Sequence, residues 1–71
     1  MSAHVDWQQK NGPLEIWAWK AAFDLEYVIE DQQDGRWLVY KKRSDKQAEI
    51  VTALTLDEAK STAESDFTNV R

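Results

Sequence analysis

The chain is 71 residues long and contains no cysteine, one histidine, one proline and two glycines. The absence of cysteine excludes a disulfide framework and any metal site built on thiolates, and it fits a reducing cytoplasm. A catalytic nucleophile needs a base and a group that orients that base, and His4 supplies the sequence's single imidazole. We therefore expect a cytoplasmic protein that is not an enzyme, with no catalytic residues, no metal and no cofactor.

Long apolar runs and an excess of positive charge are also missing. No segment approaches the ~20 apolar residues that span a bilayer, and the N-terminal sequence MSAHVDWQQK lacks the apolar core of a signal peptide. The formal net charge is −4, and an acidic chain is not a typical nucleic-acid binder. We therefore predict no membrane contact, and we keep nucleic-acid binding only as an alternative.

What the chain does contain is one segment with clear helical periodicity, residues 55–70. Its apolar residues recur every three or four positions and form one stripe: Leu56, Ala59, Ala63, Phe67 and Val70. Thr55 and Glu58 have the spacing of a capping box, in which each side chain binds the other residue's backbone amide. The two alanines favour a close approach of this helix to a sheet.

The residues before the helix alternate between apolar and polar side chains, with turn residues about every ten positions. The turns are predicted at Asn11-Gly12-Pro13, Asp34-Gly35 and Ser44-Asp45-Lys46. Within residues 4–54 we predict strands at 4–9, 15–21, 25–30, 36–42 and 47–53. The sequence therefore predicts one α+β domain over residues 1–71, in which a twisted antiparallel meander of four or five strands packs on one C-terminal α-helix.

Alternation along the strands assigns their side chains to two faces. The face toward the helix is predicted to form the core, including all four tryptophans: Val5, Trp7, Trp17, Trp19, Leu25, Tyr27, Ile29, Trp37, Val39, Ile50 and Leu54. The opposite face is predicted to carry five apolar residues among charged ones: Ile16, Val28, Leu38, Tyr40 and Val51. One helix cannot cover both faces, so these five are candidate protein-binding residues. The alternative is a strongly coiled sheet that buries this face itself, with the N-terminal segment folded over it.

The main basic cluster lies in the last predicted hairpin and comprises Lys41, Lys42, Arg43 and Lys46. Cations beside aromatic residues such as Trp37 and Tyr40 can contact phosphates and stack bases, but charge is also expected at any hairpin tip. The acidic residues of the preceding hairpin, Glu30, Asp31 and Asp34, lack the ligand spacing of a calcium loop. We interpret them as a solvated turn.

Several motifs together resemble a loose group of small phage and prophage proteins. The matching residues are Trp7, Trp19-Lys20-Ala21, Tyr27-Val28-Ile29, Gly35-Arg36-Trp37-Leu38-Val39, Thr55-Leu56-Asp57-Glu58-Ala59-Lys60 and Ala63-Glu64-Ser65-Asp66. Such proteins often have glycine just before the tyrosine-containing strand, where this chain has Phe23-Asp24. The resemblance implies a phage or prophage origin, a bacterial host cytoplasm and an accessory role, and it brings no catalytic residues with it.

The sequence thus leads to three hypotheses about function. The first is a non-enzymatic phage-type accessory protein that binds a protein partner, for which a host protein is one candidate. The second is a small nucleic-acid-binding module that uses the basic hairpin at residues 41–46. The third is a structural protein that associates with itself.

Overall fold

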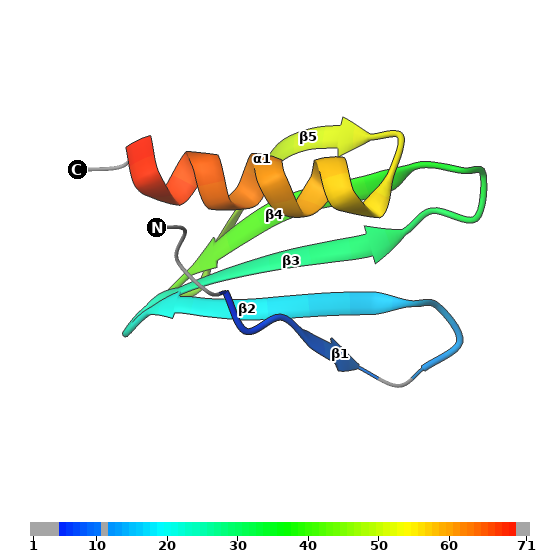
Figure 1. Cartoon of the computed structure of the whole chain (residues 1–71). Coiled ribbons are helices and arrows are strands. Elements are labelled where there is room, and N and C mark those ends of the chain that lie inside the picture. The colour runs from blue at the N-terminus through cyan, green and yellow to red at the C-terminus, as the bar shows by residue number, and fades with distance from the viewer. Residues whose placement is uncertain (1–4, 11, 70–71) are drawn as a thin grey trace.

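The computed structural model of the chain describes residues 5–10 and 12–69. Within these residues the backbone forms five strands and one helix: β1 (Gln8–Lys10), β2 (Ile16–Ala22), β3 (Leu25–Asp31), β4 (Trp37–Arg43), β5 (Lys46–Ala53) and α1 (Leu56–Asn69). Each strand pairs antiparallel with the next, so the sheet is a meander in the order β1-β2-β3-β4-β5 (Figure 1). Helix α1 lies across one face of the sheet and packs against β3, β4 and β5. The predicted α+β fold is confirmed.

The largest difference from the predicted boundaries is at the N-terminus. The strand expected over residues 4–9 forms only at Gln8–Lys10, and it pairs with Ile16–Ala18 of β2. The residues before it, Val5 and Trp7, are half-buried and lead the chain toward the helix side of the sheet. The expected strand start at His4, the turn residue Asn11 and the expected helix end at Val70 lie outside the described residues.

Helix α1 begins with the predicted cap, in a slightly different form. The Glu58 amide donates to Oγ1 of Thr55 over 3.0 Å, as a capping box requires. The Glu58 carboxylate accepts from the amide of Leu54 at 3.3 Å, whereas the sequence predicted the amide of Thr55. Asp57 and Glu58 add negative charge to the first turn, where it stabilises the positive end of the helix dipole.

The β3–β4 connection is a five-residue loop, residues 32–36, and of the predicted turn pair Asp34-Gly35 only Gly35 has a positive φ. Positive φ angles occur at Gln33 (65°) and Gly35 (84°). The Asp31 carboxylate accepts from the Gln33 amide at 2.9 Å, and the Asp34 carboxylate accepts from the Arg36 amide at 3.2 Å. The acidic side chains of this segment therefore shape the loop by binding its backbone.

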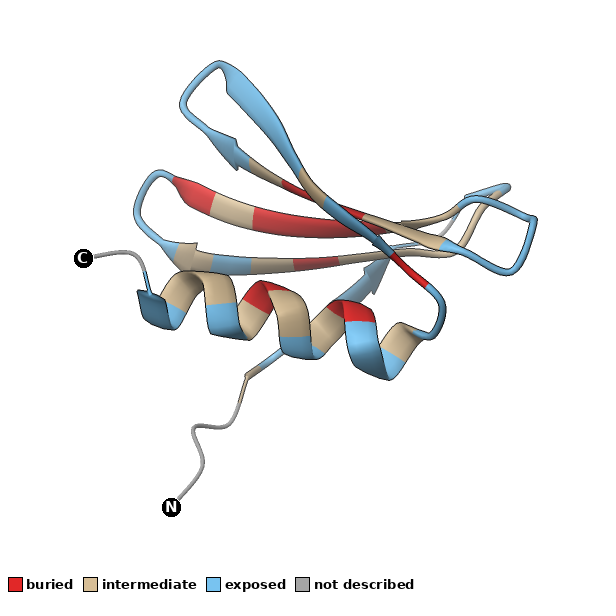
Figure 2. Cartoon of the chain, turned by 90° about the horizontal axis from the view of Figure 1, so that it is seen from above, coloured by how far each residue is buried: buried red, intermediate tan, exposed pale blue. Residues whose placement is uncertain are grey.

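The core lies between the sheet and α1, as Figure 2 shows. Its buried members come from four elements: Leu25, Tyr27, Ile29, Val39, Ala53, Ala59 and Ala63. The two helix alanines have no exposed surface, which confirms that they let α1 approach the strands closely. The four tryptophans, Ile50, Leu56 and Phe67 pack around this centre and are half-buried.

Aromatic contacts and polar side chains fix the helix on the sheet. Trp19 contacts Trp7, Tyr27 and Phe67, with ring centroids 5.4–5.5 Å apart. The hydroxyl of Tyr27 donates to Asp66 at 2.7 Å, and Lys41 forms an ion pair with the same carboxylate at 3.3 Å.

One residue of the predicted core, Leu54, lies outside the observed core, because it is 71% exposed. Strand β5 ends at the buried Ala53, so alternation turns Leu54 outward where the chain leaves the sheet.

Candidate binding surface on the open face of the sheet

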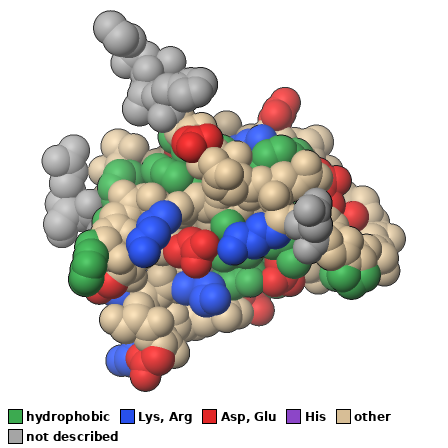
Figure 3. All heavy atoms as spheres, turned by 90° about the horizontal axis from the view of Figure 1, so that it is seen from below, with side chains coloured by type: hydrophobic (Ala, Val, Ile, Leu, Met, Phe, Trp, Pro, Cys, Tyr) green, Lys and Arg blue, Asp and Glu red, His purple; other side chains and the backbone are tan. Residues whose placement is uncertain are grey.

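The candidate site is the face of the sheet opposite α1, which we call the open face. Among the described residues, no helix or strand covers it. Figure 3 shows this side, where basic and acidic side chains lie among apolar ones. The register of the strands arranges its residues in three rows that cross β2, β3 and β4. The rows are Ile16–Glu30–Leu38, Ala18–Val28–Tyr40 and Lys20–Glu26–Lys42.

The middle row forms an apolar floor. Ala18, Val28 and Tyr40 lie side by side and are 4%, 6% and 8% exposed. The Tyr40 hydroxyl donates to the Glu30 carboxylate at 2.6 Å. Burial, this hydrogen bond and the nearby negative charges of Glu30 and Glu26 raise the pKa of Tyr40 above its ordinary value. The open face therefore buries its own centre beneath longer neighbouring side chains.

The row nearest the β3–β4 loop contains the half-exposed apolar residues. Ile16 and Leu38 both lie opposite Glu30, one on each side of it. The predicted apolar residues of this face are therefore not one continuous patch, because a carboxylate separates Ile16 from Leu38. Their exposed surfaces flank the Tyr40–Glu30 hydrogen bond.

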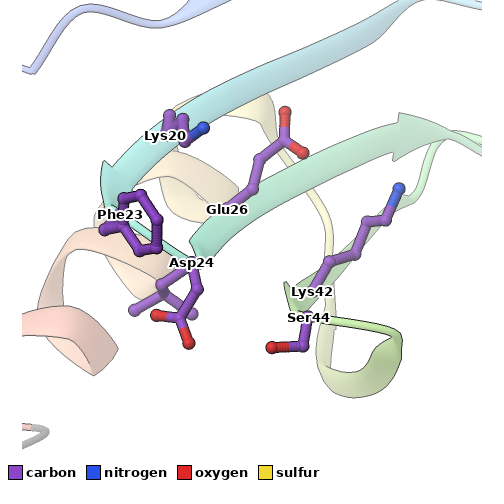
Figure 4. A pocket seen from close by; sticks show the side chains of 7 residues that line it. Lys20, Phe23, Asp24, Glu26, Lys42 and Ser44 are labelled. Atoms are coloured by element: carbon purple, nitrogen blue, oxygen red, sulfur yellow. The ribbon is translucent and has the colours of Figure 1, made fainter.

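The third row alternates in charge and borders a hollow. Glu26 lies between Lys20 and Lys42, on the two neighbouring strands. An open hollow of about 360 Å³ continues from this row toward the β2–β3 turn, where Phe23, Asp24, Leu25 and Ser44 also line it (Figure 4). Across the described part of the open face, three lysines (Lys10, Lys20, Lys42) balance three glutamates (Glu26, Glu30, Glu49). The surface is thus close to neutral although the chain carries a net charge of −4.

The structure does not bring Val51 onto the open face. A β-bulge at Ile50 shifts the register, so Val51 lies opposite the core residue Val39 while Glu49 lies opposite Tyr40. Side chains of directly paired residues point to the same side of a sheet, so Val51 belongs to the helix side, where it is 40% exposed. The bulge also turns Ile50 toward the core, as predicted.

The N-terminal segment does not fold over the open face within the described residues. Trp7 packs against the core cluster and its indole Nε1 donates to the Glu64 carboxylate of α1 at 3.0 Å. This contact holds the segment on the helix side. The burial alternative is therefore met only in that the centre of the open face is buried; within the described residues the N-terminal segment does not cover it.

The strand register divides the basic cluster between the two faces. Lys42 lies opposite Glu26 and belongs to the open face. Lys41 lies opposite Tyr27 and pairs with Asp66, and Arg43 lies opposite Leu25 and Lys46, all on the helix side. The four cations therefore do not form one continuous basic surface along which a phosphate backbone could run.

One exposed residue was not among the predicted site residues. Phe23 occupies the two-residue turn between β2 and β3 and is 95% exposed. The one sequence signal for it was the presence of Phe23-Asp24 where the proteins that the chain resembles often have glycine. Phe23 borders the hollow at the end of the open face (Figure 4).

No group of three or more histidine, cysteine, aspartate or glutamate side chains is placed to hold a metal ion within residues 5–10 and 12–69. In the same part of the chain, no helix is long and apolar enough to cross a membrane. No protein-family model, no curated protein sequence and no solved structure matches this chain.

Proposed function

We propose that this chain is a non-enzymatic accessory protein of phage or prophage type that binds a protein partner through the open face of its sheet. The observation that carries the proposal is the surface opposite α1, where Ile16 and Leu38 remain half-exposed around a charge-balanced centre. The phage-type role is supported by the motif resemblance, which runs from Trp7 to Asp66.

The chemistry of the face fits a protein better than a nucleic acid. Exposed apolar groups bordered by charges of both signs are typical of the centre and rim of a protein interface. A phosphate backbone would meet Glu26, Glu30 and Glu49 on the same surface as the three lysines. The partner should therefore present an apolar segment flanked by alternating charges.

The test uses two identical substitutions at different places. Leu38→Asp puts a charge at the half-exposed edge of the open face, and Leu54→Asp puts the same charge at an exposed leucine outside it. The full-length chain and both variants are immobilised and exposed to bacterial lysate, and captured proteins are identified by mass spectrometry. Circular dichroism and melting curves first establish that both variants are folded.

The expected result is a protein captured by the parent and by Leu54→Asp, and lost with Leu38→Asp. Lys42→Glu reverses one charge in the Lys20–Glu26–Lys42 row and should weaken the same capture, because positive and negative side chains then no longer alternate around Glu26. Equal capture by all variants would assign binding to another surface. If only nucleic acid is recovered, or nothing specific to the parent, the proposal fails.

A further inference from the structure

A second surface lies at one end of the sheet, which we call the hairpin end. It comprises the β2–β3 turn, with Phe23 and Asp24, and the β4–β5 turn, with Ser44 and Asp45. The register pairs Leu25 with Arg43, the residues next to these turns, so the two turns are neighbours. Figure 1 and Figure 2 both show them at the same end of the molecule. This end joins an exposed aromatic residue and most of the basic cluster.

The first component is a projecting aromatic residue beside a carboxylate. The side chain of Phe23 is 95% exposed, the largest exposure among the large apolar residues described. Asp24 follows it in the turn and is also exposed. A phenylalanine at a turn tip contributes nothing to the core, and buried aromatic anchors are common at the centres of protein contacts.

The second component is a hollow of about 290 Å³ in the β4–β5 hairpin. Its walls are Lys41, Arg43, Lys46, Gln47 and Ala48. Lysine and arginine stems are aliphatic and carry their charge at the tip, so this hollow has apolar walls and a cationic rim. The chain's own Phe23 does not fill it, because that ring is almost fully exposed.

The two components are complementary. An aromatic ring fits between aliphatic stems, and cations at the rim attract both the ring face and an adjacent carboxylate. Because both lie at the hairpin end, two copies related by a twofold axis can exchange them reciprocally. We propose that this chain self-associates end to end, each copy inserting Phe23 into the β4–β5 hollow of the other while Asp24 pairs with Arg43 and Lys46.

The size of this contact sets the expected strength. Each phenylalanine buries roughly 150–250 Å² at most, and stable interfaces bury about 1,200–2,000 Å² in total. The dimer should therefore be weak and depend on protein concentration. Because attraction between Asp24 and the cations contributes to it, added salt should weaken it further. The contact borders the hollow at the end of the open face but does not use Ile16 or Leu38, which carry the function proposed above, so it does not rest on that function.

The first experiment is analytical ultracentrifugation of the full chain from micromolar to millimolar concentration. We expect a reversible monomer–dimer equilibrium, and we expect Phe23→Ala to raise its Kd by about tenfold or more. Leu54→Ala is the matched control, because Leu54 is also an exposed large apolar residue but does not lie in either turn. Its Kd should equal that of the parent.

A charge exchange tests the pairing directly. Asp24→Arg and Arg43→Asp should each weaken self-association, because each leaves like charges facing one another across the contact. An equimolar mixture of the two variants should restore the dimer, since both contacts of the mixed pair again join opposite charges. Lys46→Asp replaces Arg43→Asp if the latter fails to fold by circular dichroism.

Three results would overturn the inference. The first is a parent that stays monomeric at millimolar concentration. The second is a dimer that Phe23→Ala leaves intact or that Leu54→Ala weakens equally. The third is a failure of the mixed variants to associate. A retarded oligonucleotide band that depends on Phe23, in a chain that stays monomeric, would assign this end to nucleic acid instead.

Discussion

The two faces of the sheet bury their centres in different ways. The helix side excludes water with a second element, since Ala59 and Ala63 of α1 lie directly on the strands. The open face uses its own longer side chains, so that Val28 and Tyr40 are nearly inaccessible without any covering helix among the described residues. Burial alone therefore does not tell which face is part of the core and which is available to a partner.

The same contrast appears in the two buried tyrosines. Tyr27 donates to Asp66 on α1, 39 positions away in the sequence, whereas Tyr40 on β4 donates to Glu30 on the neighbouring strand β3. One hydrogen bond joins two layers and the other stays within the sheet. The helix side should consequently account for most of the stability, and the open face should tolerate more change. Five predictions test this contrast between the two faces.

The largest effect is expected from one substitution made on both faces. Ile29→Ala removes a fully buried side chain beside α1 and should cost about 2–5 kcal/mol of unfolding free energy. Ile16→Ala removes the same atoms from the half-exposed edge of the open face and should cost about 1 kcal/mol. Urea unfolding curves measure both losses, provided that the dependence of the unfolding free energy on urea concentration is the same for parent and variants. Equal losses would show that the open face is as much a part of the core as the helix side.

The next effect separates the two tyrosines. A hydrogen bond to a charged group is worth about 1.5–3 kcal/mol, so Tyr27→Phe and Tyr40→Phe should both destabilise the fold. The loss should be greater for Tyr27→Phe, because its hydroxyl also fixes α1 on the sheet. Urea midpoints decide the order, and a larger loss for Tyr40→Phe would contradict the comparison.

These tyrosines also predict sensitivity to alkali. Burial, the hydrogen bond to Asp66 and the charge of Asp66 raise the pKa of Tyr27 above its ordinary value, as Glu30 does for Tyr40. A raised pKa in the folded state means that the fold favours the protonated phenol. The stability that each tyrosine contributes is therefore complete below the unfolded pKa of about 10, and it is lost as the pH rises further. Stability should therefore fall above about pH 10, and less steeply in either phenylalanine variant. The ultraviolet absorbance of tyrosinate measures ionisation of the phenols, and the melting temperature measures the loss of stability.

A smaller effect concerns the start of α1. Thr55→Ala removes the hydroxyl that accepts from the Glu58 amide and should cost about 0.5–2 kcal/mol. Thr52→Ala, at an exposed position on the open face of β5, is the control and should change stability less. Coincident urea midpoints for parent and Thr55→Ala would show that the cap does not stabilise the helix side.

The smallest effect is expected for nucleic acid. The cations at residues 41–46 lie on both faces, and Lys41 is already paired with Asp66. We therefore expect no gel retardation of single-stranded or duplex probes at physiological salt. A salt-sensitive shift that disappears on charge reversal of Lys41, Lys42 and Arg43 would favour the nucleic-acid alternative. If Lys42→Glu alone abolished the shift, the open face would be the binding surface.

Much of this architecture follows from alternation and turn chemistry. The order of the strands, the side of the sheet taken by Tyr27, Ile29 and Val39, and the helix with its cap were all predictable from local patterns. Prediction from the sequence failed where one extra residue reverses which side chains of a strand point to each face of the sheet. The extra residue at Ile50 reverses the side on which Val51 lies, and no glycine or proline marks that bulge. Phase errors of this kind affect site residues more than core residues, because a core residue has many partners to fix its position.

The candidate site was harder to predict than the fold for a second reason. Alternation placed Ile16, Val28, Leu38 and Tyr40 on one face correctly, but it could not tell which would be accessible. Accessibility depends on the register, which sets Glu30 between Ile16 and Leu38 and places Tyr40 beside Val28. Phe23 was missed because periodicity describes strands and gives no information about a turn residue.

The position of α1 after all five strands has a consequence during synthesis. Tyr27, Ile29 and Val39 are made before Ala59, Ala63 and Phe67, which shield them in the finished fold. At typical rates of translation the helix follows within a time on the order of a second. The helix side of the sheet therefore stays uncovered until the segment made last has left the ribosome and docks on it, so the core closes only after residues 56–69 have been made.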